Sequence, residues 1–251
     1  MHVSTPTVID KNIIVKADQN RLIMSLAYNT KQELLRGAHL KQFEKGEVLE
    51  TQGEFGRNVF FTLSGLLISI FEGKDGTGIA NAMRGPEAAY GAISSGSSTA
   101  QIGTGRVIAQ MPSEFLIISK ANFSKILMKS NDLLRVILAH AAEIVRNHEV
   151  TLNCSRHHKI DKRLAHLLTL LNFYNKDPEL PATHSELGEI LGVRRESVST
   201  ALSEYEKSNL IDVSRGRIYI RDIQRLENLT CECHQELLRL RARELLARTG
   251  C

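Results

Sequence analysis

Residues 183–207, which read THSELGEILGVRRESVSTALSEYEK, constrain the fold of this chain more than any other stretch. Apolar side chains recur there at helical spacing in two short segments, namely Leu187, Ile190 and Leu191, followed by Val198, Leu202 and Tyr205. Gly192 lies between the segments, where a helix must end and the chain must turn. Gly188 leaves room for a second helix to cross closely. The pattern predicts a compact helix-turn-helix.

The second of these segments also has a polar face. Arginine can form a bidentate pair with guanine, glutamate can accept a hydrogen bond from the cytosine amino group, and a threonine methyl can contact thymine. Residues four apart share a helix face, which groups these side chains together. The candidate DNA-contacting residues of the segment are Arg194, Arg195, Glu196, Ser197, Ser199 and Thr200. The alternative is an ordinary exposed face of a helical hairpin.

A hairpin is predicted after this unit. Residues 211–220 read IDVSRGRIYI, with Ser-Arg-Gly-Arg as the turn and Gly216 free to adopt positive φ. Such a wing places Arg215 and Arg217 where they can contact a phosphate backbone. The alternative is that both charges serve only solubility. An amphipathic helix that starts near Asp161 is predicted before the helix-turn-helix, because leucines recur there at helical spacing. The residues after 222 are also predicted to be mostly helical.

The first half of the chain has a different composition. Twelve of the 17 glycines fall between Gly46 and Gly105. Short apolar runs lie between them, at residues 48–49, 59–63, 66–71, 79–83, 107–111 and 115–118. Regular short strands with glycine turns predict a small β-barrel or roll. Short helices are predicted between Asn20 and Gly37, and no regular structure before Asn20.

A single long helix is predicted from about Asn122 to Ser155. Apolar and small side chains alternate at spacings of four and three along it, namely Leu134, Leu138, Ala141, Val145, His148 and Leu152. This is the pattern of a coiled-coil seam and predicts a parallel homodimer. The alternative is that the stripe packs on the β-roll of its own chain, as we expect for Ile137 and Ile144. The residues 156–159, RHHK, interrupt the pattern and suggest a hinge.

Composition limits the remaining possibilities. The net charge is +4, and no apolar run is long enough to span a membrane. There is no secretory signal pattern, and the four cysteines form no CxxC pair, so we expect reduced thiols in the cytoplasm. Cys231 and Cys233, placed on one helix, would point about 200° apart. No metal site is therefore predicted, and no haem or enzyme site is supported by residue spacing.

A β-roll, a long helix and a winged helix-turn-helix, in this order, resemble the cyclic-AMP receptor protein and FNR (Crp/Fnr) family of bacterial transcription regulators. The motifs that carry the resemblance are GEVLETQG at 46–53, FFTLSG at 60–65, residues 187–210 and RIYI at 217–220. The resemblance implies that Arg195, Glu196, Ser199 and Thr200 face the bases. It also implies that Thr183 contacts a phosphate. Thr200 departs from the family, where arginine is common, so the usual guanine contact is not expected there.

The ligand pocket of the family is where the likeness fails. Cyclic-AMP-binding members carry Gly-Glu for the ribose, then Arg followed by Ser or Thr for the phosphate. Here the corresponding pairs are Gly91-Ala92 and Gly103-Thr104. A buried phosphate needs a fixed cationic partner, so we expect no cyclic-nucleotide binding. The iron–sulfur branch uses N-terminal cysteines, and none precedes Cys154.

These observations predict an α+β chain with an N-terminal cyclic-nucleotide-binding-like β-roll (1–120), a dimerisation helix (121–155), a winged helix-turn-helix (156–230) and a helical tail (231–251). The predicted function is a homodimeric, sequence-specific DNA-binding transcription regulator that reads a near-palindromic operator. Its partners would be double-stranded DNA and, for an activator, RNA polymerase. The rival hypothesis is a ligand-sensing module with an effector in the β-roll that gates the output.

Overall fold

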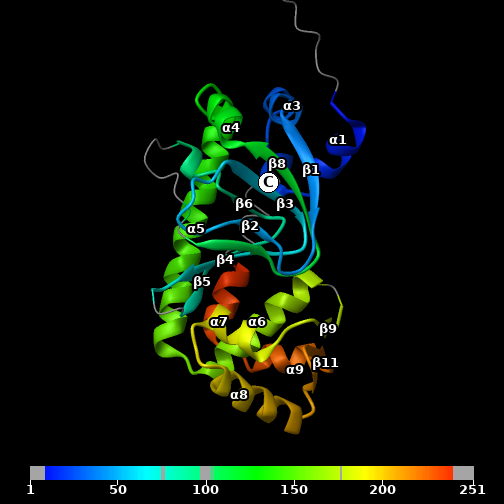
Figure 1. The fold of residues 1–251 in the computed structure, drawn as a ribbon, viewed down its shortest axis with the longest axis vertical. Helices are drawn as coiled ribbons and strands as arrows, with labels where there is room; N and C mark the ends of the chain where they lie inside the picture. The colour runs from blue at the N-terminus through cyan, green and yellow to red at the C-terminus, as the bar shows by residue number, and fades with distance from the viewer. Residues whose placement is uncertain (1–8, 75–76, 97–102, 104, 176, 240–251) are drawn as a thin grey trace, which may run out of the picture. The chain divides into compact units, whose positions relative to one another are not determined.

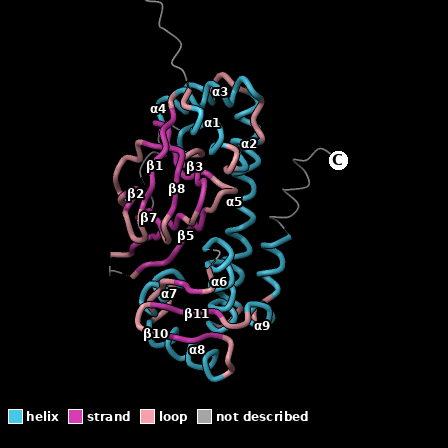
Figure 2. The backbone as a smooth tube through the Cα atoms, turned by 90° about the vertical axis from the view of Figure 1, so that its right-hand side faces the viewer, coloured by secondary structure: helices cyan, strands magenta, loops and turns pink. Residues whose placement is uncertain are grey.

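The computed structural model describes residues 9–74, 77–96, 103, 105–175 and 177–239. Contacts divide the chain into two compact units. The first comprises residues 1–67 and 83–141, and the second comprises residues 68–82 and 142–251. Figure 1 shows the elements in chain order, and Figure 2 shows which segments are helix and which are strand.

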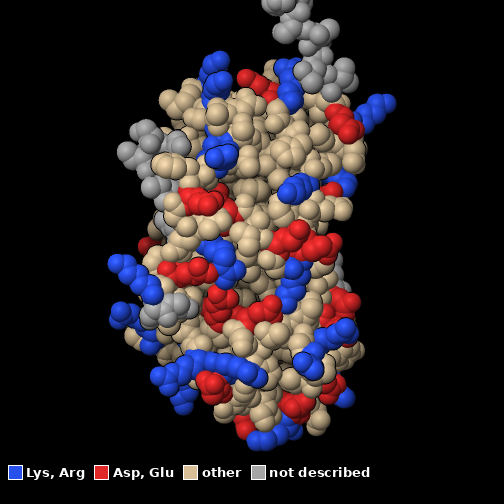
Figure 3. All heavy atoms as spheres, in the orientation of Figure 1, with Lys and Arg blue, Asp and Glu red and all other residues tan. Residues whose placement is uncertain are grey.

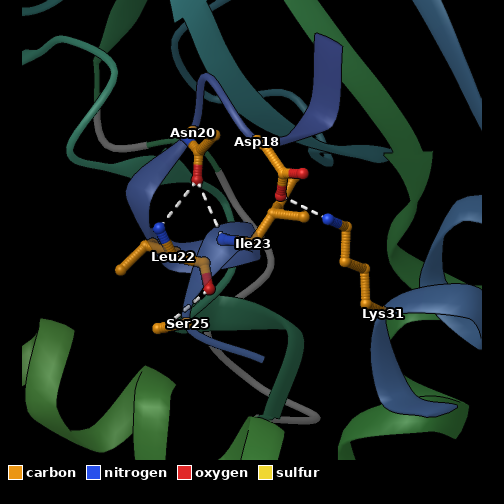
Figure 4. Close-up of polar contacts among 6 residues, drawn as sticks. All are labelled: Asp18, Asn20, Leu22, Ile23, Ser25 and Lys31. Carbon is orange, nitrogen blue, oxygen red and sulfur yellow. Dashed lines mark hydrogen bonds and ion pairs between the residues drawn. The ribbon is translucent and has the colours of Figure 1, made fainter. Parts of the chain in front are cut away.

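Three short helices precede the first strand, with bounds α1 Lys11–Ala17, α2 Arg21–Met24 and α3 Tyr28–Arg36. The helices within 20–37 are confirmed, whereas the absence of regular structure before Asn20 is wrong for α1. Asn20 explains why α2 starts where it does (Figure 4). Its Oδ1 accepts hydrogen bonds from the backbone N–H groups of Leu22 at 3.1 Å and Ile23 at 3.3 Å. Its amide donates to the carbonyls of Thr62 and Ala88, which fastens the helix start to the β-roll.

Two four-stranded sheets form the β-rich part of the fold. Their orders are β1-β8-β3-β6 and β2-β7-β4-β5. The bounds of the first are β1 Ala38–Phe43, β8 Ser113–Ser119, β3 Asn58–Ser64 and β6 Ala89–Tyr90. Those of the second are β2 Val48–Glu50, β7 Arg106–Ala109, β4 Leu67–Glu72 and β5 Gly78–Arg84. All six predicted strands are confirmed, while β1 and β6 were not predicted.

The register places large apolar side chains on the inner faces of the first sheet. In the antiparallel β3–β8 pair, Phe61 lies opposite Leu116 and Phe60 opposite Ile117. Because side chains alternate along a strand, the pair supplies two cores. Phe61 and Leu116 join the helices in one core, and Phe60 and Ile117 pack with Phe115 in the other. A one-turn 3-10 helix, η1 Ser94–Gly96, follows β6.

The predicted long helix is two helices, α4 (Lys120–Leu127) and α5 (Asn131–His157). A single helix from Asn122 is therefore wrong. The physical reason is Ser130, whose hydroxyl accepts from the Leu133 backbone N–H at 3.2 Å and starts a new helix in the manner of an N-cap. The second helix is long and ends at the predicted break, because residues 158 and 159 separate it from the next helix.

The C-terminal part of the second unit combines helices with a small sheet. The bounds of its elements are α6 Ile160–Asn175, β9 Glu179–Leu180, α7 His184–Leu191, α8 Arg195–Lys207, β10 Ile211–Ser214, β11 Arg217–Ile220 and α9 Ile223–Asn228. The sheet order is β10-β11-β9. The predicted hairpin is thus confirmed, and β9 is an additional strand on its other side.

A last described helix covers residues 232–239. Cys231 lies just before it and Cys233 lies in its first turn. The prediction that both cysteines lie on one helix is therefore wrong, and the 200° separation it implied does not apply. Among the apolar residues after 222, Leu226, Cys233 and Leu237 are buried, whereas Leu229 is exposed. Leu240, Leu245 and Cys251 lie outside the described residues.

Candidate nucleic-acid interface

The turn between α7 and α8 depends on two glycines. Gly192 has φ of +65° and ends α7 in the left-handed conformation, which glycine adopts without strain. Gly188 lies where the chain comes back on α7, and a Cβ built there would lie 2.9 Å from the Val193 carbonyl oxygen. The Val193 backbone N–H donates to the Gly188 carbonyl at 2.9 Å. The close approach of backbone to backbone fixes how α8 leaves α7.

Thr183 starts α7 with a capping box. Its hydroxyl oxygen accepts from the Glu186 backbone N–H at 3.2 Å, and the Glu186 carboxylate accepts from the Thr183 backbone N–H at 2.7 Å. In this cap the hydroxyl oxygen of Thr183 acts only as an acceptor. The O–H of Thr183 can still donate a hydrogen bond, and a donor at a helix N-terminus is suited to an anionic phosphate.

The inner faces of α7 and α8 are buried as the apolar spacing predicts. Leu187, Val198 and Leu202 are almost completely inaccessible to solvent. Tyr205 is buried too, and its hydroxyl donates to the Asp161 carbonyl of α6. Burial raises the pKa of Tyr205, and the nearby Asp161 adds to the effect. Arg163 of α6 donates to the Leu191 carbonyl at 2.5 Å, which satisfies an end of α7.

The outer face of α8 carries the predicted polar side chains. Arg194, Arg195, Glu196 and Thr200 are exposed, whereas Ser197 and Ser199 are half-buried. Figure 2 shows α8 beside the hairpin of β10 and β11 within the same unit. Glu196 lies in the first turn of α8, where the helix dipole favours a negative charge. The Thr200 hydroxyl donates to the Glu196 carbonyl at 3.0 Å, so its methyl is the part best suited to a base.

Ser199 has partners inside the protein. Its hydroxyl donates to the Arg195 carbonyl at 3.1 Å, and its oxygen lies 2.8 Å from Nδ1 of His184 on α7. The contact with His184 links α7 to α8, whereas the bond to Arg195 lies within α8. His184 was not among the predicted site residues, and only the packing of α7 on α8 reveals it. The Ser199 hydroxyl is thus hydrogen-bonded within the protein.

The hairpin turn places two arginines at its tip. Gly216 has φ of +75°, and Arg215 and Arg217 on either side of it are exposed. Arg217 forms an ion pair with Glu179 of β9, with 2.9 Å between Nη1 and Oε1. Exposed pairs of this kind contribute little to stability, so a phosphate can compete for the guanidinium. At the other end of the hairpin, Asp212 hydrogen-bonds Arg221 at 2.6 Å and raises its pKa.

Charge alone does not mark the interface. Lys and Arg are interspersed with Asp and Glu on the face drawn in Figure 3, and the net charge of the chain is only +4. Any DNA-binding surface must therefore depend on where individual cations lie.

The predicted seam on α5 is solvent-exposed along its length. The exposed fractions are 41% for Leu134, 61% for Leu138, 55% for Val145 and 61% for Leu152. Ala141 is half-buried and His148 is exposed, with its Nε2 2.7 Å from the Asn81 carbonyl of β5. In contrast, Ile137 is buried in the core of its own chain. The leucines and the valine of the stripe thus keep much of their apolar surface exposed in a single chain.

The described part of the candidate effector pocket brings two glycines close to an acidic and a basic side chain, Glu50 and Lys120. Gly91 has φ of +80°, and a Cβ there would lie 2.7 Å from the Asn58 carbonyl oxygen; Ala92 is fully buried. A Cβ on Gly103 would lie 2.9 Å from a carboxylate oxygen of Glu50. Lys120 lies beside the same carboxylate, since a Cβ on Gly56 would meet Nζ of Lys120 and would lie 2.6 Å from an oxygen of Glu50. Thr104 and the serines at 97–98 lie outside the described residues.

Glu50 is electrostatically coupled to Lys120. Burial raises the pKa of Glu50, and Lys120 and a hydrogen bond from Tyr90 lower it in part. Burial likewise lowers the pKa of Lys120, and Glu50 opposes that shift. Sequence reasoning missed this pair, because neither residue belongs to the motif positions used for the pocket.

The chain was compared with models of protein families and with solved structures. Residues 162–229 match the Crp-like helix-turn-helix domain. The solved structures similar to this chain include a transcriptional regulator of the Crp/Fnr family from Eubacterium rectale, with 20% identity, a TM-score of 0.70, and coverage of 84% of this chain and 98% of that one. FixK2 from Bradyrhizobium japonicum has 19% identity and a TM-score of 0.62 over 77% of this chain and 98% of its own. The c-di-GMP-responsive regulator CLP from Xanthomonas campestris has 14% identity and a TM-score of 0.62 over 77% and 99%.

Residues 162–229 thus match a Crp-like helix-turn-helix domain, and the fold of the chain is similar to the folds of solved Crp/Fnr-type regulators. Residues 162–229 belong to the Crp-like helix-turn-helix family, and the resemblance stated from the sequence motifs is confirmed. Among curated proteins, no sequence matches this chain. Within the described residues, no helix has the length and apolar character that crossing a bilayer requires.

Proposed function

We propose that the protein is a cytoplasmic homodimer that reads a near-palindromic DNA operator with α8. The observation that carries the proposal is the exposed polar face of α8, held on α7 by a buried apolar interface and a glycine turn. Two copies of such a helix, related by two-fold symmetry, require half-site centres about 34–36 Å apart.

Individual residues have separate roles in this proposal. Arg195 forms a bidentate pair with guanine, Glu196 accepts from a cytosine amino group, and Thr200 places its methyl against thymine. Arg194, Ser197 and Ser199 make supporting contacts to the DNA at the N-terminal end of α8. Thr183, Arg215 and Arg217 contact phosphates and set the register of the protein on the duplex without reading sequence.

The dimer forms through α5. The stripe from Leu134 to Leu152 has the alternating spacing of a parallel coiled coil, and its leucines and valine are exposed in a single chain. A matching stripe on a second chain would cover them. The same proposal divides the chain into four parts: a β-roll (1–120), a dimerisation helix (121–155), a winged helix-turn-helix (156–230) and a tail (231–251). If the protein is an activator, it also contacts RNA polymerase. We propose no enzymatic activity for it.

Selection of bound sequences from a random DNA library tests this function. The full chain should enrich an inverted repeat whose half-sites lie one helical turn apart. Enrichment of a single, unrepeated half-site would contradict the dimer, and recovery of no common sequence would contradict specific recognition.

Replacing Arg215 with Ala should weaken binding to all DNA sequences by a similar factor. The reason is that a phosphate contact releases counterions without reading bases, so the slope of log affinity against log salt should fall by about one per protomer. Fluorescence anisotropy at several salt concentrations measures both quantities. Arg221→Ala is the matched control, because Arg221 carries the same charge at the end of the hairpin opposite its tip, where it pairs with Asp212, and it should leave the slope almost unchanged. An unchanged slope for Arg215→Ala would remove Arg215 from the interface.

Cyclic AMP, cyclic GMP and c-di-GMP, each at millimolar concentration, should leave the unfolding temperature of the protein unchanged. Gly91-Ala92 and Gly103-Thr104 replace the Gly-Glu and Arg pairs of the cyclic-AMP-binding members, and the nearby cation, Lys120, already neighbours the carboxylate of Glu50. A ligand at about 100 times its dissociation constant would stabilise the fold by about 2.7 kcal/mol, which thermal unfolding detects readily. Stabilisation by one nucleotide would favour the alternative, in which an effector in the β-roll gates DNA binding.

A further inference from the structure

Three cysteines and a histidine from distant parts of the sequence meet at the end of α5. Cys154 lies in the last turn of α5, His158 directly after it, and Cys231 and Cys233 at the start of the helix 232–239. Their potential ligand atoms all lie within 4.8 Å of one another. The three cysteines are buried and unbridged, and His158 is half-buried. All four belong to the second compact unit.

The spacing of these atoms fits one tetrahedral ion. Zinc binds thiolates at about 2.3 Å and imidazoles at about 2.0–2.1 Å, so tetrahedral ligand atoms lie roughly 3.5–3.8 Å apart. Sγ of Cys154 lies 3.5 Å from Sγ of Cys231, and Sγ of Cys233 lies 3.6 Å from Nδ1 of His158. A Cys₃His set is among the ligand combinations of structural zinc sites.

Neighbouring groups orient the ligands as metal sites require. The imidazole of His158 has Nδ1 towards Cys233, and its Nε2 lies 3.1 Å from a carboxylate oxygen of Glu232. A carboxylate that accepts the second ring N–H fixes the tautomer in which Nδ1 is free to bind metal. The amide of Asn153 donates to Sγ of Cys233 at 3.7 Å. These contacts form a second layer around the four candidate ligands.

Other chemistries fit these positions less well. A disulfide requires sulfur atoms about 2.05 Å apart, whereas the Cys154 and Cys231 sulfurs are 3.5 Å apart and free. In an iron–sulfur cluster the thiolates bind different iron atoms, and four ligand atoms within 4.8 Å leave too little room. Burial and the adjacent thiols raise the pKa of Cys154, whereas reactive redox thiols have lowered values.

We propose that Cys154, His158, Cys231 and Cys233 bind one structural Zn²⁺ ion, which ties the end of α5 to the segment that follows the winged helix-turn-helix. The ion closes a loop that contains α6, the helix-turn-helix and the hairpin. It also fixes His158 at the break between α5 and α6, where the sequence indicated a hinge. The metal thereby limits how the DNA-binding elements can move on α5.

The test is the metal content of the full chain, purified under reducing conditions with zinc in the growth medium. About one zinc ion per chain is expected by elemental analysis. Reconstitution with Co²⁺ should give the thiolate charge-transfer bands and the intense visible bands of a tetrahedral site. Removal of the ion with a strong chelator should lower the unfolding temperature, because a metal that binds the native state stabilises it.

Variants locate the site. Cys154→Ser and Cys233→Ser should lose the zinc and the cobalt bands, whereas His157→Ala should retain both, since His157 is exposed and is not one of the four proposed ligands. The Co²⁺ spectrum of the unmodified chain decides the question even where a variant fails to fold. A chain that binds no zinc and shows no thiolate bands with Co²⁺ would overturn the proposal. Retention of the metal by both cluster variants, or a Cys154–Cys231 disulfide in metal-free protein, would overturn it as well.

Discussion

Replacing Leu138 with Asp should convert the protein to a monomer and weaken binding to its operator by about 100-fold or more. Leu138 is 61% exposed near the middle of the α5 stripe, so the change does not disturb the core of a single chain. In the proposed seam, however, the two aspartates would face each other across the two-fold axis without water or a counter-charge. The loss of affinity follows because linked half-site binding typically gains 10²–10⁴-fold over a single site.

Analytical ultracentrifugation measures the oligomeric state, and anisotropy with operator DNA measures the affinity. Ala139→Asp is the matched control, because it adds the same charge at an exposed position about 100° further round the helix. That variant should remain dimeric. A dimeric Leu138→Asp protein with unchanged affinity would mean that the stripe serves another contact.

Replacing Arg195 with Ala should reduce discrimination between the operator and random DNA by about 1–3 kcal/mol per half-site, or roughly 5- to 160-fold. Arg195 is exposed in the first turn of α8, and the apolar face of the helix is fixed by Val198 and Leu202, which are buried. The substitution therefore removes a contact to bases without removing a contact in the core. Affinity for random DNA should fall much less, because the variant loses only the attraction of one positive charge to the phosphate backbone.

Competition titrations with operator and random duplexes give this discrimination directly. Lys207→Ala removes the same charge from the other end of α8, where Lys207 pairs with Glu204 at 2.7 Å, and should leave discrimination intact. Urea unfolding should give the same stability for both variants, because both side chains are exposed. Equal loss of affinity for operator and random DNA in Arg195→Ala would make Arg195 a phosphate contact.

The helix-turn-helix could be predicted from sequence because its determinants are local. The apolar spacing, the glycine at Gly192 and the capping pair of Thr183 and Glu186 all lie within one short stretch, and each agrees with the others. The hairpin was predictable for the same reason, because Gly216 marks its turn. Periodicity also separated Ile137, which packs on its own chain, from the exposed positions of the α5 stripe.

The features that were missed depend on partners distant in sequence or on a single polar residue. Strand β6 has only two residues and is defined by pairing with β3, so no periodic pattern could reveal it. Ser130 divides α4 from α5 by one hydrogen bond to Leu133, within a polar run at 129–132 that the predicted single helix passed through. The cysteine cluster was missed because Cys231 precedes its helix, and Cys154 is distant from it in sequence.

The central claim is that the outer face of α8 reads bases, and the sequence motif bound by Arg195→Ala tests it most directly. Selection from random DNA would be carried out in parallel with the unmodified chain, Arg195→Ala and Arg215→Ala. We expect the Arg195→Ala motif to lose its preference at one guanine in each half-site and to keep the other positions and the spacing, whereas Arg215→Ala should select the same motif with weaker affinity. An identical motif for Arg195→Ala and the unmodified chain would contradict base reading by α8.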